Sequence, residues 1–409
     1  MKTSRRKFIS TGSVLAVGSA LSLAPASAVS KAKPVKESLI SKDRFDPWIE
    51  LIPDAMRHNV KLLHSLAGKR PIMAVVKNNG YGLGQENIAK IIEGMPEVAG
   101  FAAVKTAACL SLRESGVNKT ILHMGMATDQ DFSDLVASNI QLSIYSKDIR
   151  AILEPIAKKL GRSINVHQYI DTGMSRMGIP YHKALPWMLD IANSNNIDII
   201  GSFMGFTEDE TFDKEQLRRF KELTNKANAK GANPGILHAA SSHGIYHFAD
   251  ASLDMVRPGI AIYGAYPADP DIEKPLGELQ VAYRLKARVV RVEQLQAGDS
   301  VSYGRKFIAE KPTWVATLPI GHSDGYPRNT VKGVKVLISN KLYSVIGAVS
   351  ASHTILEIGN EPIVKVGDEA ILVGPDHEDI HPNNISKVAD VSVYDILMHM
   401  NAKLPKIIL

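Results

Sequence analysis

The chain has very little cysteine and no excess of charge, and each shortage excludes a class of protein. Cys109 is the only cysteine among 409 residues, so an internal disulfide and a multi-cysteine metal site are both impossible. The formal charge is +6, but four basic residues lie in the first 28, which contain no acidic residue. Without those four of the 48 basic residues, 44 remain against 42 acidic ones. This near-neutral balance predicts no basic surface for nucleic acid or membranes.

The first 28 residues have the three-part pattern of an export signal. Ser4-Arg5-Arg6-Lys7-Phe8-Ile9 is followed by a moderately apolar stretch to Leu23 and by the small-residue cleavage site Ala26-Ser27-Ala28. The apolar stretch is too short to span a bilayer, so we expect no stable membrane association after removal of the signal. The paired arginines resemble a twin-arginine signal, which exports folded proteins. The sequence therefore predicts a periplasmic protein.

Strand-like and helix-like patterns alternate through the first two thirds of the chain. Short apolar, β-branched runs occur at Ile72–Val76, Phe101–Val104, Thr120–Met124, Gln141–Tyr145, Ile164–Ile170, Ile199–Met204, Ile236–His238 and Met255–Ile262. Amphipathic stretches separate them, which predicts parallel strands and a (β/α)8 TIM-type barrel at residues 45–275. The alternative is an open doubly wound sheet. Its dinucleotide fingerprint is missing, because Gly80-x-Gly82-x-x-Gln85 lacks the third glycine.

A different texture begins near Gln280. Segments rich in Val, Ile and Tyr are broken by Gly and Pro, and helical periodicity nearly vanishes. The short runs are Ala287–Val292, Ser300–Tyr303, Trp314–Pro319, Val334–Ile338, Tyr343–Val349, Ile355–Ile358 and Glu369–Val373. They predict a mostly β C-terminal domain at residues 276–409.

Lys77 follows directly on a buried strand, in Pro71-Ile-Met-Ala-Val-Val-Lys77-Asn-Asn-Gly-Tyr81-Gly-Leu-Gly84. Burial lowers the pKa of an amine, and a neutral amine can form a Schiff base with an aldehyde cofactor. The alternative is a lysine that only reaches past the strand end to solvent. Lys77, Tyr81 and the glycines at 80, 82 and 84 closely resemble the cofactor-lysine motif of the alanine racemase family. That resemblance favours the covalent role.

Further polar segments follow the predicted strands, where barrel active sites lie. They are Asp171-Thr-Gly-Met-Ser-Arg176, His238-Ala-Ala-Ser-Ser242 and Arg257-Pro-Gly-Ile260, and the second domain adds Val301-Ser-Tyr303-Gly, Gly321-His-Ser-Asp-Gly-Tyr326-Pro-Arg328 and Tyr394. Any one of them taken alone is better explained as a chance set of polar loop residues. Together they resemble the successive motifs of alanine racemases in order and in spacing, from about Pro47 to the C-terminus.

The resemblance implies pyridoxal 5'-phosphate as cofactor, held by Lys77 as a Schiff base. The cofactor's phosphate would be bound by Tyr81, Ser242, Gly259, Ile260 and Tyr394. Arg176 would meet the phenolic oxygen. Arg257 would face the pyridine nitrogen and leave it unprotonated, because a guanidinium does not give up its proton.

The resemblance also implies racemisation of free amino acids by two acid–base groups, one on each face of a planar intermediate. These would be Lys77 and Tyr303. The family places this tyrosine in the partner subunit, which predicts a homodimer with shared active sites. The substrate carboxylate would lie near Arg176 and Ala351.

Several positions depart from the family pattern, and all lie in the predicted pocket or at its mouth. Gly205 replaces a ring-stacking histidine, Tyr169 a carbamylated lysine, Ser241 an asparagine, His322 a tyrosine, and Ala351 the methionine of a Ser-Met-Asp motif. These changes, together with export, favour a substrate range that is broader than alanine or shifted away from it.

Three other interpretations remain. A lyase or decarboxylase on the same scaffold is disfavoured by the presence of Tyr303 and Arg257. A degenerate binding protein that only holds the cofactor is suggested by the missing histidine. A zinc site at His238, His243 and His247 lacks an HExxH motif or a nearby carboxylate, so we predict no metal and interpret the three as loop histidines.

Overall fold

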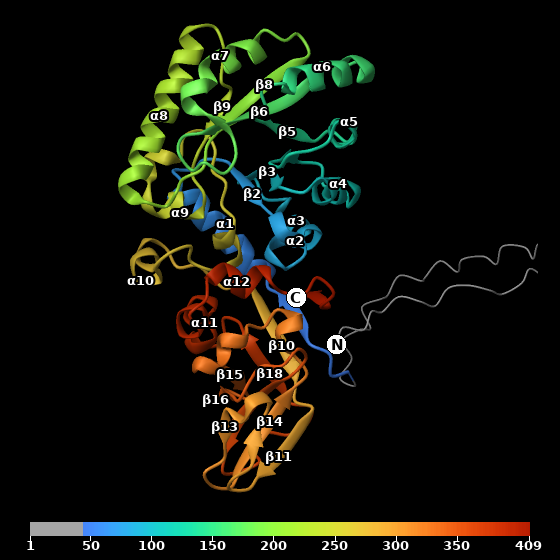
Figure 1. Ribbon diagram of the computed structural model, residues 1–409, viewed down its shortest axis with the longest axis vertical. Coiled ribbons are helices and arrows are strands. Elements are labelled where there is room, and N and C mark those ends of the chain that lie inside the picture. The colour runs from blue at the N-terminus through green and yellow to red at the C-terminus, as the bar shows by residue number, and fades with distance from the viewer. Residues whose placement is uncertain (1–43) are drawn as a thin grey trace, which may run out of the picture. The chain divides into compact units, whose positions relative to one another are not determined.

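The computed structural model describes residues 44–409 (Figure 1). The predicted export signal at residues 1–28 lies outside the described residues. Within the described part, none of the helices combines the length and the apolar character that a membrane crossing requires.

The first sheet consists of parallel strands, as predicted. Its strands run in the order β2-β3-β4-β5-β6-β8-β9, and the short β7 pairs with β6. Their bounds are β2 Ile72–Val75, β3 Val98–Ala103, β4 Thr120–His123, β5 Gln141–Ile144, β6 Ile164–Asp171, β7 Ile179–Pro180, β8 Ile197–Phe203 and β9 Ile236–His238. Each of the first seven predicted runs overlaps one of these strands, although β3 and β8 begin before the predicted runs and β6 ends one residue after its run. The sheet curls, with its helices outside, and the barrel-type fold is confirmed (Figure 1).

The predicted eighth strand, Met255–Ile262, is wrong in extent. Only Val256 forms a bridge, to Ile72. Its amide donates to the Pro71 carbonyl at 3.0 Å, and on the other side the Asp254 amide donates to the Leu237 carbonyl at 2.9 Å, so the segment still closes the sheet between β9 and β2. The strand then stops because Pro258 has no N–H, and Ile260–Tyr263 form a 3-10 helix.

Helices cover the outer face of the barrel (Figure 1). They are α1 Pro53–Leu66, α3 Gln85–Ile92, α4 Thr106–Glu114, α5 Asp129–Ala137, α6 Ile149–Leu160, α7 Tyr181–Ala192 and α8 Glu210–Ala229, whereas the short α2 Lys77–Tyr81 and α9 Ser242–His247 follow the C-terminal ends of β2 and β9. In α8, helical spacing buries Leu217, Phe220 and Leu223. The opposite face carries ion pairs such as Arg218–Glu222.

The second domain is built on a nine-stranded sheet in the order β11-β14-β17-β16-β15-β18-β10-β1-β19. The bounds are β1 Trp48–Leu51, β10 Tyr283–Arg288, β11 Arg291–Leu295, β14 Thr313–Leu318, β15 Lys335–Ile338, β16 Lys341–Ile346, β17 Thr354–Gly359, β18 Glu369–Val373 and β19 Lys406–Ile408. β1 pairs with β10 and β19 although it precedes the barrel in sequence. The predicted run Ala287–Val292 straddles the break between β10 and β11.

Short elements complete the second domain and its connection. A hairpin of β12 (Ser300–Val301) and β13 (Phe307–Ile308) carries Tyr303. The helices are α10 Pro270–Glu273, α11 Pro382–Ala389 and α12 Val393–Met398. Short 3-10 turns occur at Ala249–Ala251, Ile260–Tyr263, Lys274–Leu276, Tyr303–Arg305, His322–Asp324, Arg328–Lys332 and Glu378–Ile380.

Candidate active site

A cavity of about 590 Å³ lies at the C-terminal ends of the barrel strands. All the residues predicted to bind the cofactor line it: Lys77, Tyr81, Arg176, Ser242, Arg257, Gly259, Ile260 and Tyr394. Tyr394 comes from α12 of the second domain, and its ring centroid lies 6.4 Å from that of Tyr81. The barrel ends and α12 therefore build one site.

Tyr303 and Ala351 do not reach this cavity. They line a separate cavity of about 970 Å³ in the second domain, together with His322 and Arg328. The Tyr303 side chain is 75% exposed. Within one chain, the two predicted acid–base groups therefore lie in different cavities.

A left-handed turn follows Lys77. Asn78, Asn79, Gly80 and Tyr81 have φ angles of 53°, 58°, 59° and 55°. This conformation costs roughly 1–2 kcal/mol for each non-glycine residue, and asparagine tolerates it better than most residues. A Cβ at Gly80 would lie 2.9 Å from the Gln85 amide nitrogen, so only glycine fits there. Such strain is typical of functional sites, and here it lies between the lysine and the first phosphate ligand predicted.

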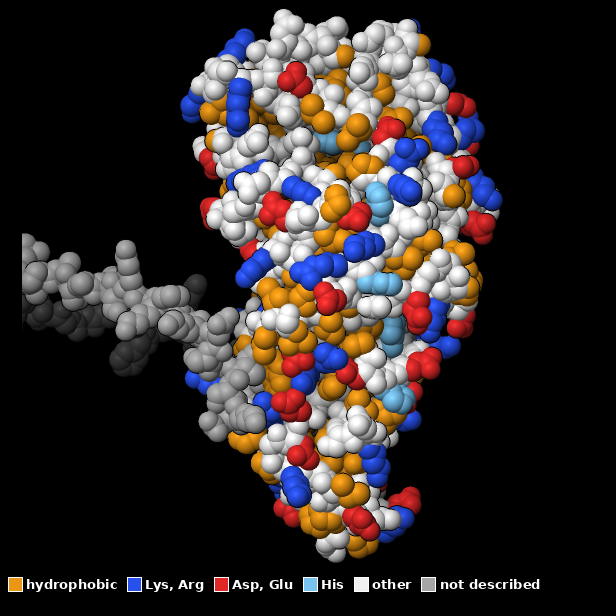
Figure 2. Space-filling model, turned by 180° about the vertical axis from the view of Figure 1, so that it is seen from behind, with side chains coloured by type: hydrophobic (Ala, Val, Ile, Leu, Met, Phe, Trp, Pro, Cys, Tyr) orange, Lys and Arg blue, Asp and Glu red, His pale blue; other side chains and the backbone are white. Residues whose placement is uncertain are grey.

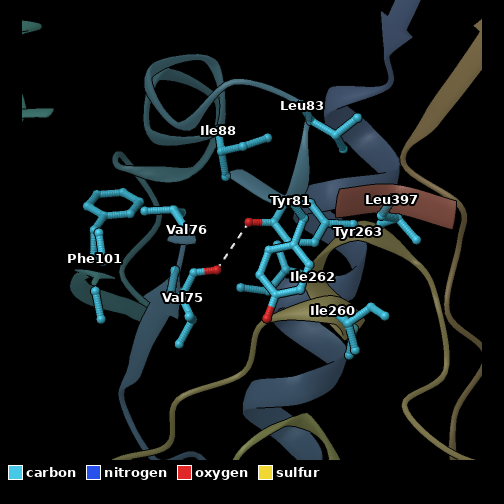
Figure 3. Packing of buried hydrophobic residues seen from close by; sticks show 14 of the residues in the cluster. Val75, Val76, Tyr81, Leu83, Ile88, Phe101, Ile260, Ile262, Tyr263 and Leu397 are labelled. Carbon is cyan, nitrogen blue, oxygen red and sulfur yellow. Dashed lines mark hydrogen bonds between the residues drawn. The ribbon is translucent and has the colours of Figure 1, made fainter. Parts of the chain in front are cut away.

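The packing around Tyr81 holds this turn against the barrel. Tyr81 is buried beside Tyr263, with ring centroids 4.8 Å apart, and the Tyr263 hydroxyl donates to the Val75 carbonyl at 3.1 Å (Figure 3). Ile260 and Ile262 pack in the same cluster (Figure 3). The end of β2 and the 3-10 helix at Ile260–Tyr263 thus fix the phenol's position.

Lys77 has the electrostatic environment of a reactive amine. Desolvation by burial lowers the pKa of Lys77, and the positive charge of Arg176 lowers it further. The negative charge of Glu208 acts in the opposite direction. More of the amine is therefore neutral at a given pH than in a free lysine.

Removal of either charge beside Lys77 should shift the pH dependence of covalent pyridoxal phosphate capture, and the two shifts should be opposite in direction. Arg176→Gln removes a nearby positive charge, so the pKa of Lys77 should rise and covalent capture of pyridoxal phosphate should need a higher pH. Glu208→Gln should move the same profile to lower pH. The measurement is the rate of appearance of visible absorbance after cofactor is added to cofactor-free protein, as a function of pH. Shifts in the same direction would contradict the assigned electrostatics.

Neutral hydrogen-bonding groups converge at one end of the cavity. The Ser242 hydroxyl, at the start of α9, accepts from the amides of Gly259 at 2.9 Å and Ala261 at 3.3 Å. Burial raises the pKa of Tyr81 and of Tyr394, so both phenols stay protonated at neutral pH. Hydroxyls and backbone amides of this kind suit a phosphate group.

Gly259 provides a close approach that a side chain would block. A Cβ there would lie 2.1 Å from Tyr81 Oη. We expect Gly259→Ala to weaken pyridoxal phosphate binding about 10- to 100-fold, as the displacement of a packed group usually costs 1–3 kcal/mol. Gly94→Ala, where a Cβ meets nothing within 4 Å, is the matched control. Unchanged cofactor affinity in a titration of Gly259→Ala would mean that the phosphate binds elsewhere.

Arg257 is buried and fixed by several acceptors. Its guanidinium donates to His238 Nδ1 at 2.9 Å, to the His238 carbonyl at 2.6 Å and to the Met204 carbonyl at 2.6 Å. Burial lowers the pKa of Arg257 to about 10, so it remains protonated at neutral pH. A permanent, immobile donor at this point fits an unprotonated pyridine nitrogen.

A chain of buried hydrogen bonds continues from Arg257 into the barrel. His238 Nε2 lies 2.9 Å from His167 Nδ1, and His167 Nε2 lies 2.8 Å from Gln141 Oε1. Burial lowers the pKa of His167 to about 4 and that of His238 well below its usual value, so both are neutral. Since His238 Nδ1 accepts from Arg257, its Nε2 carries the proton and donates to His167, which donates to Gln141.

The interpretation of the three histidines as loop residues is wrong, because His238 is the last residue of β9 and is fully buried, and His243 and His247 lie in α9. His167 was missed altogether. The signal that points to His238 and His167 is a histidine inside a strand pattern, where an unpaired ring would be costly to bury. Among the described residues, no group of three His, Cys, Asp or Glu could hold a metal ion.

The fold and the cavity together define a class: a barrel enzyme whose lysine, phosphate cradle and buried arginine fit pyridoxal phosphate. Family models refine this class. The model of the alanine racemase N-terminal domain matches residues 52–267, and that of the C-terminal domain matches residues 282–408. The chain belongs to the alanine racemase family, whose enzymes are isomerases that use pyridoxal 5'-phosphate.

Individual relatives agree with this assignment. The alanine racemase of Desulforamulus reducens is 30% identical over 366 residues, which cover 88% of this chain and 98% of the relative. The alanine racemase of Clostridium perfringens is 32% identical over 368 residues, or 88% and 94% of the two chains. Among solved structures, the alanine racemase of Clostridium difficile 630 has a TM-score of 0.83 at 30% identity and covers 90% of this chain and 96% of that chain.

Proposed function

We propose that this chain racemises free amino acids in the periplasm as a homodimer with shared active sites, and that its substrates extend beyond alanine. The observation that carries the proposal is the separation of Lys77, in the barrel cavity, from Tyr303, in the cavity of the second domain. One chain alone has an acid–base group on one face of the site only. A partner subunit would supply the second group.

Lys77, Tyr303 and Arg257 each have a different role in the proposed reaction. Lys77 would hold the cofactor covalently, and once the substrate's amine has displaced it, its free amine would take or return the α-proton on one face, while Tyr303 of the other chain would serve the opposite face. When bound, pyridoxal phosphate stabilises the negative charge that develops on the substrate carbon. Arg257, as a permanent donor, would leave the pyridine nitrogen of a bound cofactor unprotonated. This restrains charge delocalisation into the ring and so disfavours side reactions such as transamination.

The local structure around Tyr303 supports a role at an interface. The exposed phenol is presented by a strained turn in which Ser302 has φ 60° and ψ −169°, Gly304 has φ 73° and Arg305 has φ 49°. A left-handed serine and arginine at an exposed position cost free energy and are typical of functional segments. An exposed tyrosine in such a turn is suited to insertion into a neighbouring site.

The mouth residues support a wider substrate range. Ala351 and His322 line the cavity that carries Tyr303, and His322 Nε2 accepts a hydrogen bond from Arg328 at 2.8 Å. The resemblance gives Ala351 the position of a methionine, so the smaller side chain leaves more room beside the substrate. The periplasmic location is supported by the sequence pattern of residues 1–28 alone.

The direct test is incubation of the purified mature protein with each L-amino acid, followed by separation of the enantiomers. The proposal expects D-enantiomers of alanine and of larger amino acids, and α-proton exchange in deuterium oxide. Release of carbon dioxide or loss of the side chain would indicate a lyase or decarboxylase. A protein with bound cofactor that neither racemises nor exchanges protons would be a binding protein.

A further inference from the structure

Two of the departures from the family pattern, Tyr169 and Gly205, meet in the cavity. A Cβ on Gly205 would lie 3.7 Å from Tyr169 Oη and 3.6 Å from Met174 Sδ. These are ordinary contacts for a methyl group, but a longer side chain at position 205 would extend into the tyrosine hydroxyl and the methionine sulfur. The space beyond Gly205 is therefore already filled by Tyr169, which comes from the neighbouring strand β6.

Tyr169 belongs to a row of three rings, of which Tyr169 and Phe203 line the cavity. Strand register places Tyr169 beside Phe203 on β8, and Phe203 beside His238 on β9. The rings of Tyr169 and Phe203 stack with centroids 4.3 Å apart and planes 26° apart, and those of Phe203 and His238 stack at 5.0 Å and 19°. Arg257 Cζ lies 5.0 Å from the Phe203 centroid, so the row leads to the guanidinium.

The Tyr169 ring is held firmly and still borders the cavity. Tyr145 contacts it edge-on, with centroids 6.0 Å apart and planes at 85°. Tyr169 lines the cavity and is 8% exposed, whereas the Tyr145 hydroxyl is buried without a hydrogen-bond partner among the described residues. Tyr169 is thus tightly packed by its neighbours and also places its hydroxyl oxygen beside position 205.

We propose that Tyr169 is a positioning residue that supports the cofactor ring from β6, in place of a side chain at position 205. Tyr169 and Gly205 then belong to one substitution: the ring of Tyr169 on β6 fills the space that a side chain at position 205, in the loop after β8, would otherwise occupy. A tyrosine also has no carboxylate, so position 169 does not offer Arg176 the acidic partner that a carbamylated lysine would. The inference rests on the proposed function for the identity of the ligand.

The test is a double-mutant cycle on cofactor affinity, which does not require turnover. Dissociation constants for pyridoxal phosphate are measured by absorbance titration of cofactor-free wild type, Tyr169→Ala, Gly205→His and the double variant. Tyr169→Ala should bind about tenfold more weakly, because it loses an aromatic contact. Gly205→His alone should also weaken binding. In the Tyr169→Ala background, however, Gly205→His should restore affinity, because the space for the imidazole is then free.

Additive effects in the cycle, or wild-type affinity in Tyr169→Ala, would overturn the proposal. Tyr169→Leu keeps most of the side-chain volume and serves if the alanine variant does not fold, as judged by circular dichroism, and it should lose affinity similarly. Tyr343→Ala removes an equally well buried tyrosine from β16, outside the cavity, and should leave affinity unchanged. If the cycle is non-additive but the protein does not racemise any amino acid, the proposed function is contradicted and this inference still holds.

Discussion

Co-expression of Lys77→Ala and Tyr303→Phe protomers is expected to recover about a quarter of the wild-type racemase activity in the unfractionated mixture and about half in the isolated mixed dimer, although each variant alone is nearly inactive. Each substitution removes one acid–base group and should lower the rate by about 10²–10⁴-fold. In a mixed dimer, one site combines both substitutions and the other combines an intact Lys77 with an intact Tyr303. Random assortment gives mixed dimers in about half of the population, with one working site of two in each.

The experiment uses two differently tagged chains expressed together, with the mixed dimer isolated by both tags. Racemisation of the best substrate is then compared with that of each parent variant and of wild type. Both parents should keep their fold, because Tyr303 is exposed and Lys77 lies at the edge of a cavity. An isolated mixed dimer as inactive as its parents would show that the two groups act within one chain.

Lys77→Ala is expected to remove the visible absorbance of the cofactor-bound protein and to lower racemisation by about 10⁴-fold or more, since covalent binding and one acid–base group are lost together. Lys77→Arg is the matched control for charge: it keeps a cation in place but has no neutral amine, so it should be equally colourless and inactive. Tyr303→Phe should stay coloured. Retention of the visible band in Lys77→Ala would show that another amine holds the cofactor.

Much of the fold could be predicted because the barrel strands are buried on both faces and therefore form continuous apolar runs. Ile72–Val76 is a clear example, whereas Ile164–Ile170 also contains Asn165, His167 and Gln168. The short extent of the closing strand could not be predicted, since Val256 is held by backbone hydrogen bonds to segments distant in sequence. The role of β1 was missed for a similar reason: four residues before a helix give no sign of a partner that follows the whole barrel.

The residues predicted to bind the cofactor line one cavity, and Tyr303 and Ala351 line a second one. The hydrogen bonds from Arg257 through His238 and His167 to Gln141 were not predicted, because they join three strands whose register the sequence does not reveal. The contact between Tyr169 and position 205 escaped for the same reason. In the sequence, Tyr169 and Gly205 each look like the loss of a family residue. Only the pairing of β6 with β8 brings the Tyr169 ring beside position 205, where it can take the place of the missing side chain.

The position of β1 also determines how the molecule can be divided. β1 lies between β10 and β19 in the nine-stranded sheet, yet the entire barrel is encoded between β1 and β10. A fragment starting at residue 276 would leave β10 and β19 without their common neighbour and expose two unpaired edges, which invite aggregation. During synthesis, β1 cannot pair with β10 until the whole barrel has been synthesised. We therefore expect the two domains to fold together and not to be separable into independently stable fragments.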